Sequence, residues 1–151
     1  MKDYLEKRRA ELKKRGNKGF TLMEMLIVVA IIAVLIAIAI PIFTSQLESA
    51  RDATSVANIR SAYTEAQAAY LNESDSAANI NFVKTGNKIT GVTVTNVAIE
   101  SQQANDWSGK GADLPVKQAD GEVLSDPGTN GAKAITFTYG DDNTVTASWA
   151  N

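Results

Sequence analysis

The longest apolar stretch of the chain covers residues 25–40, where every position is Met, Leu, Ile, Val or Ala. Counted from Phe20 to Phe43, the stretch has 24 residues and a single charged one, Glu24. A helix of that length reaches about 36 Å, whereas the hydrocarbon core of a bilayer is about 30 Å thick. A small soluble domain would bury a helix that is apolar on all sides only with difficulty. We therefore predict a transmembrane helix over residues 20–47 rather than a buried core helix.

A second helical pattern follows Phe43, now with one apolar face. The apolar side chains of that face recur at steps of three and four: Val56, Ile59, Tyr63, Ala66 and Tyr70. The charged residues of the same segment mostly lie off that face: Glu48, Arg51, Asp52, Arg60 and Glu65. One helix is therefore predicted from about Phe20 to Leu71, and the polar residues 72–76 end it.

The last part of the chain has the alternation that is typical of β-strands. A strand is expected over residues 89–97, and a hairpin is formed by residues 135–139 and 145–149 around the turn-rich residues 140–143. The apolar face of this hairpin should lie on the stripe of Val56, Tyr63 and Tyr70. The remaining expectations are a short strand at residues 122–124 and, over residues 101–132, a long exposed loop. The fold class is therefore α+β, with a long N-terminal helix packed on a small antiparallel sheet in one head, residues 48–151.

Charge is distributed unevenly along the chain. Residues 1–19 contain eight Lys or Arg and three Asp or Glu, whereas the rest contains seven Lys or Arg and fourteen Asp or Glu. Basic residues beside a membrane helix stay on the cytoplasmic side. We therefore expect residues 1–19 to form a cytoplasmic leader and the head to lie outside the membrane.

A secretory signal peptide is the main alternative for the N-terminal region, with Ala37-Ile38-Ala39 as a cleavage site. Three observations favour a different kind of signal. The apolar run continues beyond that tripeptide, Glu24 lies near its start, and Pro41 follows directly.

The junction between the basic and apolar parts reads Lys18-Gly19-Phe20-Thr21-Leu22-Met23-Glu24. Glycine, phenylalanine, glutamate and the apolar run in this order resemble the class III signal of type IV prepilins and related pseudopilins. The resemblance covers residues 18–43 and fades after about Leu71. It implies that a prepilin peptidase cuts between Gly19 and Phe20, removes the leader 1–19 and N-methylates Phe20. It also implies that subunits polymerise through the apolar helix with the help of an assembly platform and an ATPase motor.

Each part of this signal also has a physical reading from the residues alone. Glycine at position 19 lets an extended backbone enter a protease cleft, but it also suits a flexible break between two helices. A carboxylate in hydrocarbon is costly and therefore usually functional. The resemblance implies that Glu24 pairs with the amine of Phe20 on a neighbouring subunit. Thr21 and Glu24 also fit a capping box, which is a purely local role, and both roles can hold together.

Pro41 removes one backbone donor inside the predicted helix, so it should kink the helix or open it locally. Prolines near this position are common in pilins, and the resemblance implies a role for Pro41 in assembly. A plain kink explains the same residue, and the sequence leaves both readings open.

The sequence offers no convincing catalytic set, because the chain has neither histidine nor cysteine. We therefore predict a non-enzyme with no catalytic residues, no metal ligands and no cofactor. Asp141, Asp142 and Asn143 have oxygens suited to calcium, but a hairpin turn explains them better. Trp107 and Trp149 are interpreted as packing residues. The part of the chain after the leader is acidic and shows no cluster of basic residues that could bind phosphates, so no nucleic-acid partner is predicted.

These observations favour a structural protein, the major subunit of a type IV pilus that serves adhesion, twitching motility or related surface functions. It would be a single-pass membrane protein before assembly and part of an extracellular filament afterwards. A pseudopilin of a type II secretion or competence system shares every feature above. A membrane-anchored or secreted binding domain, with an accidental Gly-Phe junction, is a further alternative.

Overall fold

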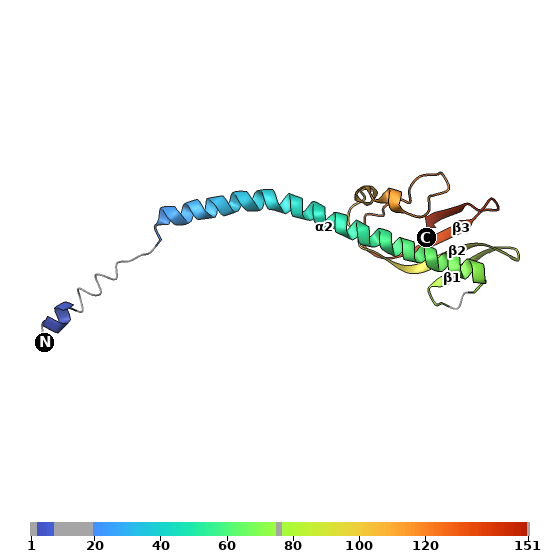
Figure 1. Cartoon of the computed structure of the whole chain (residues 1–151), viewed down its shortest axis with the longest axis horizontal. Coiled ribbons are helices and arrows are strands. Elements are labelled where there is room, and N and C mark those ends of the chain that lie inside the picture. Colours follow the sequence, from blue (N-terminus) through green and yellow to red (C-terminus); the bar gives the residue numbers. More distant parts are fainter. Residues whose placement is uncertain (1–2, 8–19, 75–76, 151) are drawn as a thin grey trace. The chain divides into compact units, whose positions relative to one another are not determined.

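The computed structural model describes residues 3–7, 20–74 and 77–150. The chain divides into two compact units, Met1–Ile42 and Phe43–Asn151. The longer elements of the described residues are one helix and four strands (Figure 1): α2 (Leu22–Asn72), β1 (Ile80–Thr85), β2 (Lys88–Ile99), β3 (Gly131–Tyr139) and β4 (Val145–Trp149). Two short 3-10 helices, η1 (Asp106–Gly109) and η2 (Gly111–Asp113), lie between β2 and β3.

Helix α2 confirms the prediction of one long helix with bounds close to those expected. It continues without a break through Pro41, so of the kink or local opening expected there, the opening does not occur in this structure. It ends at Asn72, and Glu73 follows in a left-handed conformation with φ 47°. The first part of α2 is long and apolar enough to cross a membrane, and none of its most apolar window is buried.

The four strands form one antiparallel sheet in the order β1-β2-β3-β4. The predicted hairpin is present as β3 and β4, where Phe137 lies opposite Ala147 and Tyr139 opposite Val145. Strand β1 was not predicted from the sequence. Only two of its six residues are partly buried, so its apolar alternation is too short to be recognised. The fold is therefore α+β, as expected.

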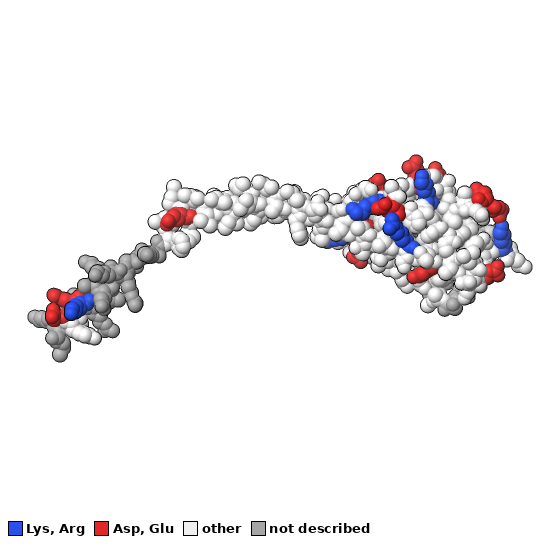
Figure 2. Space-filling view, in the orientation of Figure 1, with Lys and Arg blue, Asp and Glu red and all other residues white. Residues whose placement is uncertain are grey.

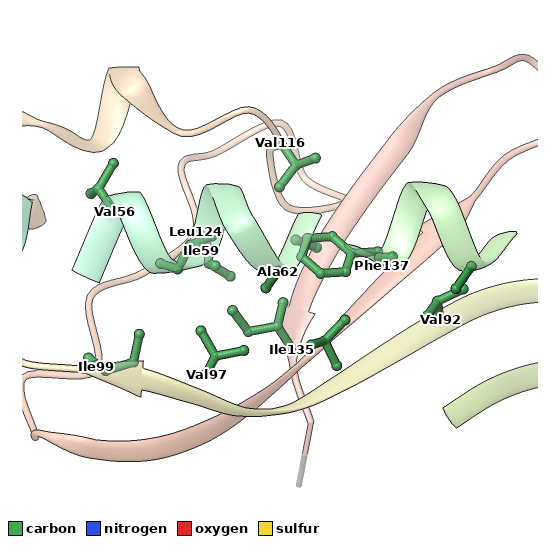
Figure 3. Packing of buried hydrophobic residues seen from close by; sticks show 14 of the residues in the cluster. Val56, Ile59, Ala62, Val92, Val97, Ile99, Val116, Leu124, Ile135 and Phe137 are labelled. Carbon is green, nitrogen blue, oxygen red and sulfur yellow. The ribbon is translucent and has the colours of Figure 1, made fainter. Parts of the chain in front are cut away.

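The second half of α2 packs on one face of this sheet (Figure 3). The ring of Tyr63 lies 5.6 Å from that of Phe137, tilted by 59°. The rings of Tyr70 and Tyr139 are stacked at 3.8 Å with 9° between their planes. Aromatic pairs of this kind add to the stabilisation from apolar burial. The predicted packing of the hairpin on the apolar stripe is confirmed.

The segment between β2 and β3 differs from the exposed loop that the sequence predicted. Trp107 is fully buried in it, and its indole Nε1 donates a hydrogen bond to the carbonyl oxygen of Leu124 at 2.8 Å. Val116 and Leu124 join the same core. The expected strand at residues 122–124 is only an isolated bridge between Lys117 and Val123. Gly, Asn, Asp and Ser are frequent in this segment, so its sequence predicted a loop and gave no sign that Val116 and Leu124 would be buried.

The turn between β3 and β4 uses the acidic residues that were also considered as calcium ligands. Asn143 adopts a left-handed conformation with φ 64°, which a turn requires. The Asp142 carboxylate accepts hydrogen bonds from the backbone N–H and hydroxyl of Thr144, and Asp141 pairs with Lys88. The hairpin-turn interpretation is therefore confirmed.

Candidate functional site

The start of α2 is held by a reciprocal pair of hydrogen bonds between Thr21 and Glu24. The Thr21 hydroxyl accepts from the Glu24 backbone N–H at 3.2 Å, and Glu24 Oε2 accepts from the Thr21 backbone N–H at 2.7 Å. The Thr21 hydroxyl also donates to Glu24 Oε2, at 2.8 Å. This arrangement is a capping box, which satisfies backbone donors that the first helical turn leaves without partners. The local prediction for Glu24 is confirmed.

The capping box places the charge of Glu24 at the beginning of the apolar segment. Figure 2 shows that segment white apart from one red patch near its start, and Glu24 is its single charged residue. Phe20 is exposed directly before the cap. Gly19, the other residue of the predicted cleavage site, lies outside the described residues, as does most of the leader.

The apolar segment has apolar side chains on every side, and no other described residues cover them. Its large apolar side chains are exposed from Leu22 to Phe43. An apolar surface of this extent marks a contact with lipid or with other protein. The same surface of the segment could therefore contact lipid in one state and other protein in another.

Two acidic side chains at the start of the second half of α2 are buried, against the expectation that they lie off the packed face. Glu48 is 3% exposed and Asp52 is fully buried. Glu48 Oε1 accepts hydrogen bonds from the backbone N–H groups of Gln102 at 2.6 Å and Gln103 at 2.8 Å. Its other carboxylate oxygen pairs with Arg51 at 3.2 Å. Glu48 thus ties the segment that follows β2 to the helix.

Neighbouring hydroxyls of α2 extend this attachment. The Ser55 hydroxyl accepts from the backbone N–H groups of Glu100 at 2.8 Å and Ser101 at 3.2 Å. The hydroxyl of Ser108 donates to the carboxylate of Asp52. We call the attachment of residues 100–108 to α2 the clasp. The clasp holds this segment to the helix without a disulfide, because the chain has no cysteine.

The contacts of the clasp favour the ionised form of the Glu48 carboxylate. Burial alone would raise its pKa, but the N–H groups of Gln102 and Gln103 and the Arg51 guanidinium hold the pKa below its ordinary value of 4.5. Because the folded pKa is lowered, the carboxylate stabilises the fold fully above about pH 4.5. That stabilisation is lost as the pH falls through the folded pKa.

Replacing Glu48 with alanine is expected to lower the free energy of unfolding by about 1–3 kcal/mol at neutral pH, because two backbone donors and Arg51 lose their acceptor. The difference from the wild type should shrink below about pH 4. Denaturant unfolding of the full chain in detergent micelles, followed by tryptophan fluorescence, measures both values. Glu122→Ala removes an exposed carboxylate and is the matched control. An equal loss in both variants, or a Glu48→Ala effect that is independent of pH, would contradict this role.

Spacing was the signal that could have found the two buried acids. Asp52 precedes Val56 by four residues, and Glu48 precedes Asp52 by four, so both continue the apolar face toward the N-terminus. Their charge argued for solvent, because Asp and Glu are seldom fully buried without partners. The partners come from residues 100–108, which no local pattern connects to the helix.

Comparisons with known proteins concern the same N-terminal region as the capping box and the apolar segment. Residues 14–40 match the model of the prokaryotic N-terminal methylation motif. The chain is also similar to the type IV major pilin protein PilA of Myxococcus xanthus (strain DK1622), with 37% identity over 107 residues. The match covers 68% of this chain and 46% of that protein, so the chain spans about half the length of this curated relative. No solved structure matches the chain.

Together the motif and the similarity support the assignment of the chain to the type IV pilins. This similarity points to a structural protein rather than an enzyme. A membrane-anchored precursor and an external filament both fit the exposed apolar helix. The cut after Gly19, the methylation of Phe20 and the assembly roles of Glu24 and Pro41 stay predictions.

Proposed function

We propose that this chain is the major structural subunit of a type IV pilus and that it polymerises through the apolar part of α2. The single observation that carries the proposal is an exposed apolar helical segment that forms the second part of an N-terminal methylation motif. Residues 1–19 would be the removed leader, residues 20–47 the membrane and assembly helix, and residues 48–151 the head. Adhesion and twitching motility are the surface functions we propose for the filament.

Glu24 would act as the register-setting charge. A carboxylate in hydrocarbon is costly unless it has a partner, and cleavage after Gly19 creates a new ammonium at Phe20. Pairing Glu24 with the Phe20 amine of a neighbour would neutralise both charges at one axial position. The capping box leaves one carboxylate oxygen for this pairing, because Thr21 donates to Glu24 Oε2 within each subunit and no described residue donates to Oε1. Processing and assembly would therefore be coupled.

The partners follow from the two environments that the helix would occupy. Before assembly, the apolar segment would anchor a single-pass subunit in the cell membrane, with the leader in the cytoplasm and the head outside. A prepilin peptidase would cut and methylate the chain, and an assembly platform driven by an ATPase motor would extract it. Transfer from lipid is favourable only if apolar contacts with other subunits' helices replace those with lipid tails.

The processed N-terminus is the first test of this proposal. Mass spectrometry of material sheared from cells is expected to yield a peptide that begins with N-methylated Phe20. A peptide that begins at Ile40 would indicate an ordinary signal peptide cut after Ala39. An intact Met1 terminus on a surface-exposed monomer would indicate an anchored binding domain instead. Either of these results would refute the proposal.

Filament length separates the pilus from the pseudopilus. Electron microscopy of cells with and without this chain is expected to show long surface fibres only in its presence. The same N-terminal peptide without long fibres, together with a loss of protein secretion or DNA uptake on deletion, would favour the pseudopilin.

A further inference from the structure

The end of the head where α2 stops contains a groove of about 770 Å³. This volume falls in the range of about 300–1,000 Å³ that is typical of small-ligand sites. The groove is lined by side chains from the end of α2 and the residue that follows it, from β1, from the turn that joins β1 to β2, and from the start of β2. The residues that matter below are Tyr70, Leu71, Glu73, Phe82, Lys84 and Asn87. None of them belongs to the N-terminal motif or to the clasp.

Tyr70, Leu71 and Phe82 are the aromatic and apolar side chains of the groove that matter here, and we call them its floor. Tyr70 is stacked on Tyr139 with 3.8 Å between ring centroids, which fixes the plane of the Tyr70 ring. Phe82 is partly buried beside the core, and Leu71 is 77% exposed at the end of the helix. Rigid aromatic faces offer contact area at little cost in conformational entropy. The groove therefore presents a ready surface for a flat apolar face of a ligand.

The rim of the groove has one positive charge that contacts an aromatic ring but has no carboxylate partner among the described residues. The Lys84 ammonium lies 5.9 Å from the centroid of the Phe82 ring and makes no ion pair with any described residue. Lys88, the second cation of the groove, is already paired with Asp141. Glu73 and Asn87 supply polar side chains on the same rim. An anionic group placed over Phe82 would thus meet Lys84.

We propose that this groove binds a pyranose sugar that carries a carboxylate, as a monomer or as a unit of an acidic polysaccharide. A pyranose has a C–H face that packs on an aromatic ring, and its hydroxyls can bond to Glu73 and Asn87. Its carboxylate complements Lys84 in a charge-assisted hydrogen bond. A neutral sugar would leave the ammonium without a partner, and a simple anion would leave the aromatic floor uncovered. The proposal stands independently of filament formation.

Isothermal titration of the full chain in non-ionic detergent micelles tests this inference, with trigalacturonate as the probe. Lys84→Gln removes the charge at an exposed position and should weaken binding about fivefold or more. Phe82→Leu keeps apolar bulk but removes the ring, and it should weaken binding about threefold. Lys133→Gln changes a lysine on β3 outside the groove and should have less than about a twofold effect. Tryptophan fluorescence checks that each variant is folded.

Four results would overturn the proposal. Maltotriose, a neutral trisaccharide, is expected not to bind, and equal binding would show that the carboxylate plays no part. N-acetylated and C-terminally amidated triglutamate carries the same number of carboxylates on a peptide, and equal binding would show a general anion site instead. Equal weakening by Lys84→Gln and Lys133→Gln, or no measurable binding of trigalacturonate, would show that the groove is not a sugar site.

Discussion

Replacing Glu24 with alanine is expected to abolish filaments while the chain still inserts into the membrane. The apolar segment loses its single charge, so insertion becomes easier. In the filament, the new ammonium of Phe20 would lie in an apolar surrounding without a counter-charge, which is strongly unfavourable. Electron microscopy of sheared surface material measures the polymer, and membrane fractionation measures insertion. Normal fibres from Glu24→Ala would refute the pairing of Glu24 with Phe20.

Two further variants separate the charge of Glu24 from its capping role. Glu24→Gln keeps an oxygen that can accept from the Thr21 backbone N–H, but it removes the negative charge. We expect it to behave like alanine and form no filaments. Thr21→Val removes the hydroxyl of the cap and leaves the carboxylate in place, so filaments should form. The opposite pattern would show that helix capping, rather than charge pairing, is what assembly requires.

Replacing Trp107 with alanine is expected to destabilise the head by about 3–5 kcal/mol, the largest effect of a single side chain on its stability. Trp107 is fully buried, and its indole N–H bonds to the carbonyl of Leu124. Its backbone is left-handed, as are those of Asp106 and Ser108, with φ values of 56°, 55° and 52°. Such a conformation is unfavourable for residues other than glycine. The free energy gained by burying the indole has to offset this cost. Denaturant unfolding of the full chain measures the loss.

Trp107→Phe and Trp149→Ala are the matched comparisons. Phenylalanine keeps most of the buried ring but loses the bond to Leu124, so an intermediate loss of stability is expected. Trp149 is only partly buried, and its indole bond to Ser125 is exposed, so its truncation should cost less. A loss in Trp149→Ala as large as that in Trp107→Ala would contradict a special anchoring role for Trp107.

The helix and the hairpin were predictable because their patterns are local and periodic. Residues 25–40 are continuously apolar, and the stripe of Val56, Ile59, Tyr63, Ala66 and Tyr70 repeats at helical spacing. Strands β3 and β4 alternate cleanly around the turn at residues 140–143. The capping box was predictable for the same reason, because Thr21 and Glu24 are three residues apart on one helix start.

The clasp and β1 depend on contacts between distant residues and had no local signal. Glu48 is buried because the backbone of Gln102, more than fifty residues away, supplies its donors. Trp107 was recognised as a packing residue, but its surroundings suggested an exposed loop. The groove beside Tyr70 arises only when the end of α2 meets the turn between β1 and β2. Pairings of this kind are set by the tertiary fold and not by periodicity.

The clasp makes maturation of the head independent of oxidation. Residues 100–108 are fastened to α2 by carboxylates and hydroxyls of Glu48, Asp52 and Ser55, with no sulfur–sulfur bond to be formed. Reducing agents should therefore leave the fold intact. Because the chain has no cysteine, the head needs no thiol oxidoreductase to reach its final shape.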